Sequence, residues 1–312
     1  MSPLKKILTF VLAATLVVSL GACGSEPAPA QESSSQAQSQ ADAASSSEAP
    51  KAAAMTGVIN VVSREEGSGT RGAFTEITGV VQDKKDMTKP DAAIQNSTDQ
   101  VITYVSGDKA SIGYISLGSL NDTVKAVKVD GAEATEENVL SGTYPVKRPF
   151  NIVYKAGVNE QTKDFISFIM SKEGQDLAKD SKVIAKDSNA KPYAKSKDFS
   201  GSIRIQGSTS VTPYMEKLME AYKKVQPGIK FDFTSNGSGA GITSTINDEA
   251  DLGMASREIK KEELDKGLTA QAIALDGIAV IIHKENPTES LAMGQLKDIF
   301  TGKITQWDEL AK

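Results

Sequence analysis

The sequence repeatedly places a short run of β-branched and aliphatic residues before a glycine- and serine-rich turn. The strand candidates are residues 58–62, 110–115, 123–129, 151–154, 202–206, 229–233 and 273–283. Apolar residues recur at helical spacing in 161–170 and 213–225. Strands that alternate with helices build parallel or mixed sheets covered by helices. The sequence therefore predicts an α/β protein, and its 312 residues are enough for about two domains.

The first residues have the pattern of an export signal. Two lysines precede an apolar run, residues 7–20, which is too short for a membrane-spanning helix of about 20 residues. The sequence LGAC that ends at Cys23 resembles a bacterial lipobox, where a peptidase cuts before the cysteine and the thiol is lipidated. The alternative is an ordinary signal peptide with a chance cysteine. We expect residues 1–22 to be a lipoprotein signal peptide and Cys23 to anchor the chain at the extracytoplasmic face of the cell membrane.

The segment after the cysteine lacks the residues that build a core. Residues 24–54 contain no Ile, Leu, Val, Met or aromatic residue and consist mostly of Ala, Ser and Gln. Such a segment cannot bury enough apolar surface to offset the entropy lost on ordering. We therefore expect residues 23–56 to be a lipidated cysteine followed by a disordered tether.

Charge and composition argue against several classes of function. A net charge of −5 argues against binding along a nucleic-acid backbone, and 5% aromatic residues leave few stacking platforms. The single cysteine and the single histidine, His283, exclude a disulfide framework and a Cys/His zinc site. We expect no enzyme activity, no metal or cofactor and no nucleic-acid partner. His283 is interpreted as a hinge or surface residue, and Trp307 as a packed aromatic.

Arginine is scarce and lies where anions bind. The five arginines include Arg64, Arg71 and Arg257, which lie in or beside Gly/Ser-rich turns. The planar guanidinium grips tetrahedral oxyanions with two donors, whereas lysine is a point charge. An acidic chain with this arrangement is expected to build a local anion site.

Four polar turns follow strand candidates. They are residues 63–71, 207–213, 236–241 and 255–258. Any single turn of this kind is more often only a helix cap. Glycines let several backbone N–H groups point into one concavity, and a helix N-terminus adds positive partial charge. Four such turns together predict an anion-binding cleft.

These segments resemble the phosphate-binding proteins of bacterial phosphate ABC transporters, over nearly all of residues 58–310. In the family's usual order the matching segments are residues 207–213 (G-S-T-x-x-x-P), 237–241 (G-S-G-x-G), 252–258 (x-G-x-A-S-R-E), 276–281 (D-G-I-A-V-I), 296–307 (L-K-x-I-F-x-G-x-I-x-x-W), 64–71 (R-E-x-G-S-G-T-R) and 112–116 (I-G-Y-I-S). The resemblance implies a two-lobed periplasmic-binding-protein fold of the class II type. It also implies capture of inorganic phosphate between the lobes and delivery to the membrane permease.

The order of the halves is exchanged relative to the family's usual order. The chain resembles a circular permutant reopened between Leu310 and Val58, with the family's own termini joined through a linker at about 188–201. Permutation succeeds when the old termini lie close together and the new termini fall in an exposed loop, where they were neighbours in the usual order. We therefore expect Lys312 to lie near Gly57.

The permutation also defines the expected lobes. Lobe B would combine residues 57–149 and 284–312, and lobe A would be continuous over 150–283. The strands near 150–154 and 280–283 would form the hinge.

The resemblance also implies the ligand-binding residues. The expected phosphate contacts are Thr209, Ser210, Ser238, Arg64, Ser68, Gly69 and Thr70. Further candidates, in contact with the anion or with its ligands, are Ser256, Arg257, Arg71, Glu66 and Asp276. Glu66 is expected to orient Arg64. Because Arg257 stands where some members place an aspartate, Asp276 is the candidate acceptor for the proton that phosphate keeps and sulfate lacks.

Two alternatives remain open from the sequence. The chain binds another tetrahedral oxyanion, such as sulfate, molybdate or tungstate, or it is a tethered phosphate sensor. The expected partners are inorganic phosphate, the permease subunits and the membrane, and the expected state is a monomer.

Overall fold

A computed structural model of the chain describes residues 55–311. The predicted signal peptide, Cys23 and the tether up to residue 54 lie outside the described residues, as does Lys312. The expectations about those residues therefore stay predictions.

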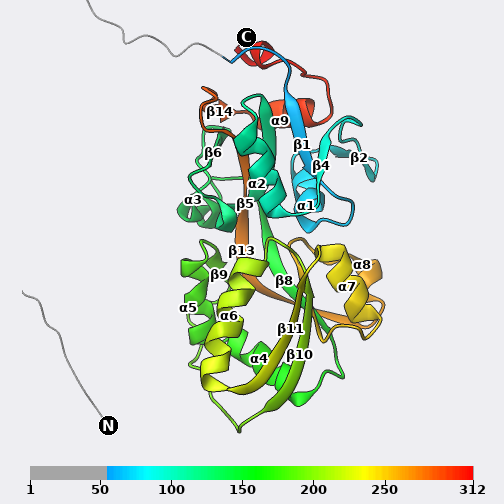
Figure 1. Cartoon of the computed structure of the whole chain (residues 1–312), viewed down its shortest axis with the longest axis vertical. Helices are drawn as coiled ribbons and strands as arrows, with labels where there is room; N and C mark the ends of the chain where they lie inside the picture. The colour runs from blue at the N-terminus through cyan, green and yellow to red at the C-terminus, as the bar shows by residue number, and fades with distance from the viewer. Residues whose placement is uncertain (1–54, 312) are drawn as a thin grey trace, which may run out of the picture. The chain divides into compact units, whose positions relative to one another are not determined.

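The described chain alternates strands and helices as expected (Figure 1). The strands are β1 (Asn60–Arg64), β2 (Val81–Gln82), β3 (Lys85–Asp86), β4 (Ala93–Gln95), β5 (Ser111–Ser116), β6 (Val124–Ala126), β7 (Lys128–Val129), β8 (Lys147–Lys155), β9 (Ile184–Ala185), β10 (Ser200–Gly207), β11 (Gly228–Ser235), β12 (Leu252–Ala255), β13 (Leu268–His283) and β14 (Ser290–Leu291). The α-helices are α1 (Gly69–Ile77), α2 (Thr98–Gly107), α3 (Glu136–Ser141), α4 (Glu160–Ile169), α5 (Lys172–Asp180), α6 (Thr212–Val225), α7 (Ser238–Ile246), α8 (Lys261–Leu264) and α9 (Met293–Phe300). The strand expected over 123–129 is broken into β6 and β7.

Local chemistry explains where several helices begin. Ser68, Ser97 and Asn159 each precede a helix, and each side-chain oxygen accepts a hydrogen bond from a backbone N–H of the first turn. Helix α6 instead begins with Pro213 in its first turn, where the missing N–H costs nothing.

One long strand joins two groups of strands in the main sheet, whose order is β11-β10-β12-β8-β13-β5-β1-β4. The first half of β13 pairs with β8 and the second half pairs with β5, both antiparallel. Strand β10 is parallel to β11 and β12, and β1 is parallel to β4 and β5. The sheet is therefore mixed. We call the strands from β5 to β4 with their helices the β1 side, and the strands from β11 to β8 with their helices the β10 side.

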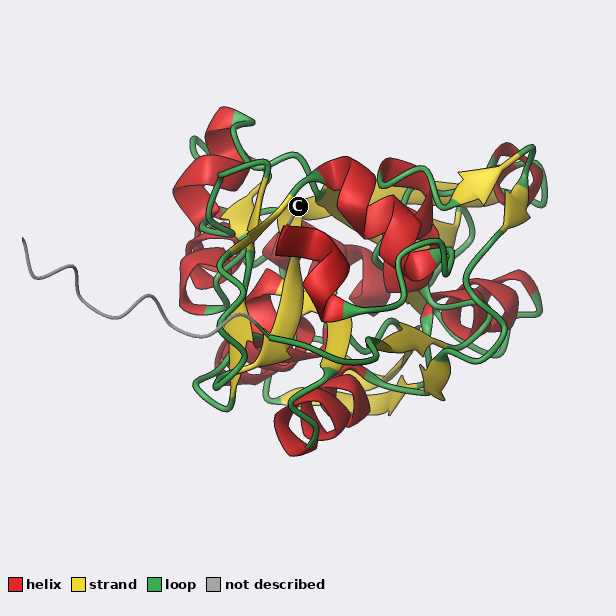
Figure 2. Ribbon diagram, turned by 90° about the horizontal axis from the view of Figure 1, so that it is seen from above, coloured by secondary structure: helices red, strands yellow, loops and turns green. Residues whose placement is uncertain are grey.

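Each side buries apolar residues on both faces of its strands. On the β1 side, Val61 packs in a large core and its neighbour Val62 packs in a smaller one, because successive side chains of a strand point to opposite faces. The large core draws on residues between 59 and 146 and between 278 and 307. On the β10 side the large core draws on residues between 150 and 274. Figure 2 shows helices on opposite sides of the strands.

The two ends of the described chain lie side by side. Trp307 N donates to Gly57 O at 2.9 Å, and Val58 forms a β-bridge with Gln306. Trp307 is 2% exposed, and its Nε1 donates to Ala110 O at 3.0 Å, which confirms that it is a packed aromatic. This closeness fits the geometry that a permuted chain requires.

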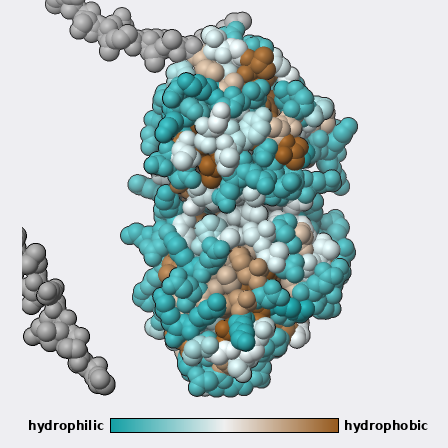
Figure 3. Space-filling model, in the orientation of Figure 1, coloured by the Kyte–Doolittle hydropathy of each residue, from teal (hydrophilic) through white to brown (hydrophobic). Residues whose placement is uncertain are grey.

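The surface in Figure 3 is mostly hydrophilic, with apolar residues in separate small patches. Leu140 and Val58 have the largest exposed fractions among the large apolar side chains, 66% and 56%. Among residues 55–311, no helix combines the length and the apolar character needed to cross a membrane.

Candidate anion site

The predicted turns meet where the parallel strands end. Arg64 is the last residue of β1, and Ser68 caps α1 directly after it. On the β10 side, the turn after β10 leads into α6, and Ser238 begins α7 after β11. Ligands of open α/β sheets bind at the carboxyl ends of strands, because loops and helix N-termini converge there.

A continuous chain of hydrogen bonds begins at Arg64 and passes between the two sides. Arg64 Nη2 donates to Thr209 Oγ1 at 3.1 Å. Thr209 Oγ1 lies 3.2 Å from Thr98 Oγ1, which lies 3.4 Å from Ser210 Oγ. Ser210 Oγ lies 2.9 Å from Thr70 Oγ1. The β1 side contributes Arg64, Thr98 and Thr70, so both sides of the sheet build this network.

Three serines extend the network on the β10 side. Ser208 Oγ donates to Ser256 Oγ at 2.9 Å, and Ser256 N donates to Ser238 Oγ at 3.1 Å. Ser210 N donates to Ser208 Oγ at 3.3 Å. We call these side chains the hydroxyl cluster: Thr70, Thr98, Ser208, Thr209, Ser210, Ser238 and Ser256. All of them are buried except Thr209, which is half-buried.

The guanidinium of Arg64 is 2% exposed and held by a carboxylate. Its Nε donates to Glu65 Oε2 at 2.7 Å and its Nη2 donates to Glu65 Oε1 at 2.8 Å. The expectation that Glu66 orients Arg64 is wrong: the orienting carboxylate belongs to Glu65, which folds back from the turn after β1. Glu66 is exposed and lines the neighbouring hollow.

Tyr114 of β5 contacts the backbone at the end of β1 that carries Arg64. Its hydroxyl lies 2.7 Å from Ser63 Oγ and accepts from Arg64 N at 3.3 Å. Its ring stacks on Phe74 with centroids 4.1 Å apart. Burial raises the pKa of Tyr114 to about 12, so the hydroxyl stays protonated and neutral at physiological pH.

The other two candidate arginines contact carboxylates outside the hydroxyl cluster. Arg71 Nε donates to Asp86 at 2.7 Å, and its Nη1 donates to Arg64 O at 2.9 Å. Arg257 donates to both carboxylate oxygens of Glu263 at 2.8 Å. Burial works to raise the pKa of Glu263, but the bonds from Arg257 and Lys260 outweigh it and lower that pKa. Arg71 and Arg257 line a hollow of about 380 Å³ beside Ser68.

Asp276 lies inside the molecule with a cation of its own. It is 0% exposed, accepts from Arg148 Nη2 at 3.0 Å and accepts from Ser116 Oγ at 2.8 Å. Arg148 Nη1 donates to Ser256 O at 3.1 Å and so links Asp276 to the hydroxyl cluster. Burial raises the pKa of Asp276 to about 6 against the pull of Arg148. The hydrogen bonds from Arg148 and Ser116 work in the opposite direction and favour the charged carboxylate.

The two sides approach closely at three glycines, Gly67, Gly69 and Gly239. Gly239 N donates to Gly67 O at 3.0 Å. A Cβ built on Gly69 would overlap Ser238 Oγ and lie 2.7 Å from Ser256 Oγ. Gly69 therefore allows an approach that no other residue allows at that position.

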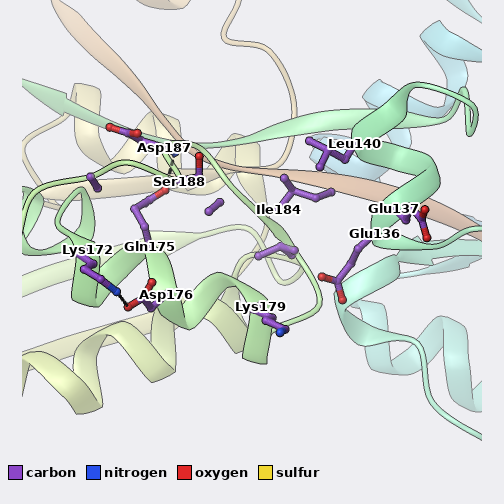
Figure 4. Close-up of a pocket in the computed structure, with 13 residues that line it drawn as sticks. Glu136, Glu137, Leu140, Lys172, Gln175, Asp176, Lys179, Ile184, Asp187 and Ser188 are labelled. Atoms are coloured by element: carbon purple, nitrogen blue, oxygen red, sulfur yellow. Dashed lines mark hydrogen bonds and ion pairs between the residues drawn. The ribbon is translucent and has the colours of Figure 1, made fainter.

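A second hollow, of about 350 Å³, lies beside β9, on the edge of β13 opposite to β8 (Figure 4). It is lined by α3, α5 and residues 183–190, with Glu136 of α3 across from Lys179 of α5. Its strand β9 pairs with one edge of β13 while β8 pairs with the other edge. Strand β8 pairs with β12, and Ser256 of the hydroxyl cluster directly follows β12. The hollow and the hydroxyl cluster are therefore separate, because they lie at opposite edges of β13.

The structure brings most of the predicted residues together. Those in or bonded to the cluster are Arg64, Thr70, Thr209, Ser210, Ser238 and Ser256, and Ser68 and Gly69 lie beside them at the start of α1. Thr98, Ser208 and Glu65 are the members of this arrangement that were not predicted from the sequence. Thr98 follows β4 in a polar turn without glycine, so a search for Gly/Ser-rich turns passes over it. Ser208 lies within the polar turn 207–213, where nothing in the sequence distinguishes its hydroxyl from that of an ordinary helix-capping serine.

Comparison with known proteins agrees with this arrangement. A family model described as a PBP superfamily domain matches residues 31–173 and 192–312. The phosphate-binding protein PstS 2 of Streptococcus pneumoniae is 46% identical over 310 residues, which cover 98% of this chain and 99% of the relative. The chain belongs to the phosphate-binding protein family. The PstS 2 of Streptococcus agalactiae is 50% identical over 262 residues, covering 82% of this chain and 89% of that protein.

A solved member of the family has the same fold. The crystal structure of a phosphate ABC transporter, phosphate-binding protein from Streptococcus pneumoniae matches with a TM-score of 0.66 and 50% identity. The match covers 81% of this chain and all of that one. The predicted α/β periplasmic-binding-protein fold is thereby confirmed. A single alignment with the pneumococcal PstS 2 covers 98% of this chain, so that relative has the same order of the halves. Circular permutation relative to other members stays a prediction.

Proposed function

We propose that the chain captures inorganic phosphate outside the cytoplasm, between lobe B (57–149 plus 284–312) and lobe A (150–283), and delivers it to an ABC-transporter permease. The observation that carries this proposal is the buried Arg64, which donates to Thr209 at the start of a chain of hydroxyls contributed by both sides of the sheet. The names of the relatives support the same ligand, and the name of the solved pneumococcal structure supports the same transport system.

The residues present suit a tetrahedral anion. Arg64 supplies positive charge in a planar fork, and hydroxyls such as Thr70 and Ser210 donate hydrogen bonds. Backbone N–H groups of Ser68 to Thr70 lie at the start of α1, where the helix dipole favours negative charge. Burial strengthens each of these interactions because water does not screen them. Arg71 and Arg257 belong to the rim of the cleft in this proposal.

Closure of the lobes would complete the site. Strand β13 pairs with strands of both sides, and β8 runs beside its first half; these two strands are the proposed hinge. A closed, phosphate-loaded form is what the permease would recognise, and an open form would release the anion. In this proposal the protein works as a monomer and catalyses no reaction.

The decisive experiment is calorimetric titration of phosphate into the purified protein after unfolding and refolding to remove bound anion. We expect tight one-to-one binding of phosphate and no heat with sulfate. Equal binding of sulfate would favour a general oxyanion-binding protein, and no binding of either anion would overturn the proposal. Phosphate uptake by a strain that depends on this protein separates a transporter from a sensor.

Gly69→Ala is expected to weaken phosphate binding about tenfold to a hundredfold. The added Cβ would overlap Ser238 Oγ and hold the two sides apart. Gly72→Ala is the matched control, since its Cβ would meet only Arg257 Cδ at 3.5 Å, an ordinary contact. Gly72→Ala should unfold at nearly the wild-type temperature, and the overlap in Gly69→Ala should lower the unfolding temperature without preventing folding. Wild-type affinity in Gly69→Ala would show that phosphate binding does not need this approach.

We also propose that Cys23 carries the lipid anchor. Cys23→Ser is expected to move the protein from the membrane fraction to the soluble fraction of cells that export it, because no thioether-linked lipid can form. Ser33→Ala, a change within the tether, is the control. Retention of Cys23→Ser in the membrane fraction would rule out this anchor.

A further inference from the structure

Thr98 occupies a position in the cleft that the family resemblance does not assign. It is the first residue of α2 and is 3% exposed. Its Oγ1 lies 3.2 Å from Thr209 Oγ1 and 3.4 Å from Ser210 Oγ. Thr209 and Ser210 belong to the β10 side, and both are proposed phosphate ligands.

Thr98 meets the same hydroxyl as another proposed ligand. Thr70 Oγ1 lies 2.9 Å from Ser210 Oγ, the atom that Thr98 also approaches. Thr70 and Thr98 belong to different helices of the β1 side, α1 and α2. The two threonines therefore approach one point of the cleft from separate elements.

The local structure of α2 does not need the hydroxyl of Thr98. The capping residue is Ser97, whose side chain accepts from Gln100 N at 3.2 Å. A β-branched residue is also a weak helix former compared with alanine. The Thr98 hydroxyl is instead directed across the cleft, toward side chains more than 100 positions away in the sequence.

We propose that Thr98 is a further phosphate-binding residue, whose hydroxyl donates to the anion between Thr209 and Ser210. This inference rests on the proposed phosphate function. In the hydroxyl cluster Thr209 already accepts from Arg64, so the chain from Arg64 through Thr209 reaches Thr98 next. A phosphate oxygen at this point would take hydrogen bonds from the hydroxyls that otherwise bond to one another.

The test replaces Thr98 by valine, which keeps the shape of the side chain and removes the hydroxyl. We expect phosphate to bind about tenfold to a hundredfold more weakly, as for loss of one hydrogen bond to a charged group. Thr98→Ser, which restores the hydroxyl, should bind within about threefold of wild type. Thr103→Val is the matched control, because Thr103 is an exposed threonine of the same helix.

The outcomes separate this inference from the proposed function. Wild-type affinity in Thr98→Val, with phosphate binding by the wild type, would overturn the inference and leave the function standing. Equal losses in Thr98→Val and Thr98→Ser would also overturn it, because packing and not the hydroxyl would then matter. Absence of phosphate binding by the wild type would overturn the function itself. If Thr98→Val fails to fold, Thr98→Ala against Thr98→Ser gives the same comparison.

Discussion

Arg64→Lys is expected to weaken phosphate binding about a hundredfold. Lysine keeps the charge but cannot donate to Thr209 and to both oxygens of Glu65 from one planar group. Hydrogen bonds to charged groups contribute about 1.5–3 kcal/mol each, and about 1.4 kcal/mol corresponds to a tenfold change in affinity. Calorimetric titration of phosphate measures the effect directly.

The control for Arg64 is an arginine far from the cleft. Arg204 pairs with Asp251 at 2.8 Å, and its side chain is 41% exposed. Arg204→Lys should bind phosphate as the wild type does. If Arg64→Lys also kept wild-type affinity, Arg64 would not be a ligand, and the anion site would have to lie elsewhere.

Arg148→Met is expected to lower the free energy of unfolding by about 3–5 kcal/mol, because it leaves the Asp276 carboxylate buried without its cation. The side chains of Arg148 and Asp276 are 1% and 0% exposed. Urea denaturation measures the change. The double variant Arg148→Met/Asp276→Leu should recover most of the lost stability, since an apolar pair needs no desolvation of charge.

An exposed ion pair is the control for this stability effect. Lys224→Met breaks the surface pair with Glu220, whose partners are 72% and 73% exposed, and should cost no more than about 1 kcal/mol. A loss in Arg148→Met as small as that of the control would contradict the prediction. It would mean that water or another group reaches Asp276.

A change at Asp276 also tests the hypothesis that this residue accepts the proton of the bound phosphate. If Asp276 accepts the phosphate proton, Asp276→Asn must reduce the preference for phosphate over sulfate. Its contacts with Arg148 of β8 and Ser116 of β5 instead favour a structural role in joining the strands on either side of β13. We therefore expect Asp276→Asn to be less stable with an unchanged preference, and a reduced preference would restore the acceptor hypothesis.

Features encoded within a few residues were predictable from the sequence. The strand predicted over 58–62, which the structure places at β1 two residues further on, the helix over α6 and the turn before α7 follow from apolar periodicity and from glycine and serine at turns. Arg64 itself could be selected because arginine is rare in this chain and this one lies at the start of a Gly/Ser-rich turn. The family motifs then identified the fold, which the solved pneumococcal structure confirms.

Contacts between distant residues could not be predicted in the same way. The pairing of Asp276 with Arg148 joins positions 128 residues apart and depends on the antiparallel register of β8 and β13. The choice of Glu65 over Glu66 depends on which way the chain turns after β1. Two adjacent glutamates offer no local signal that distinguishes them.

The sequence by itself determined the alternation of strands and helices, the polar turns and the identity of the arginine, because these depend on side-chain periodicity and backbone preference over short stretches. The tertiary structure alone decided which hydroxyls meet. Thr98 and Thr209 are 111 positions apart, and only the packing of the two sides of the sheet brings them to 3.2 Å. Binding a small anion depends on donors converging at one point, and convergence is a property of the folded chain.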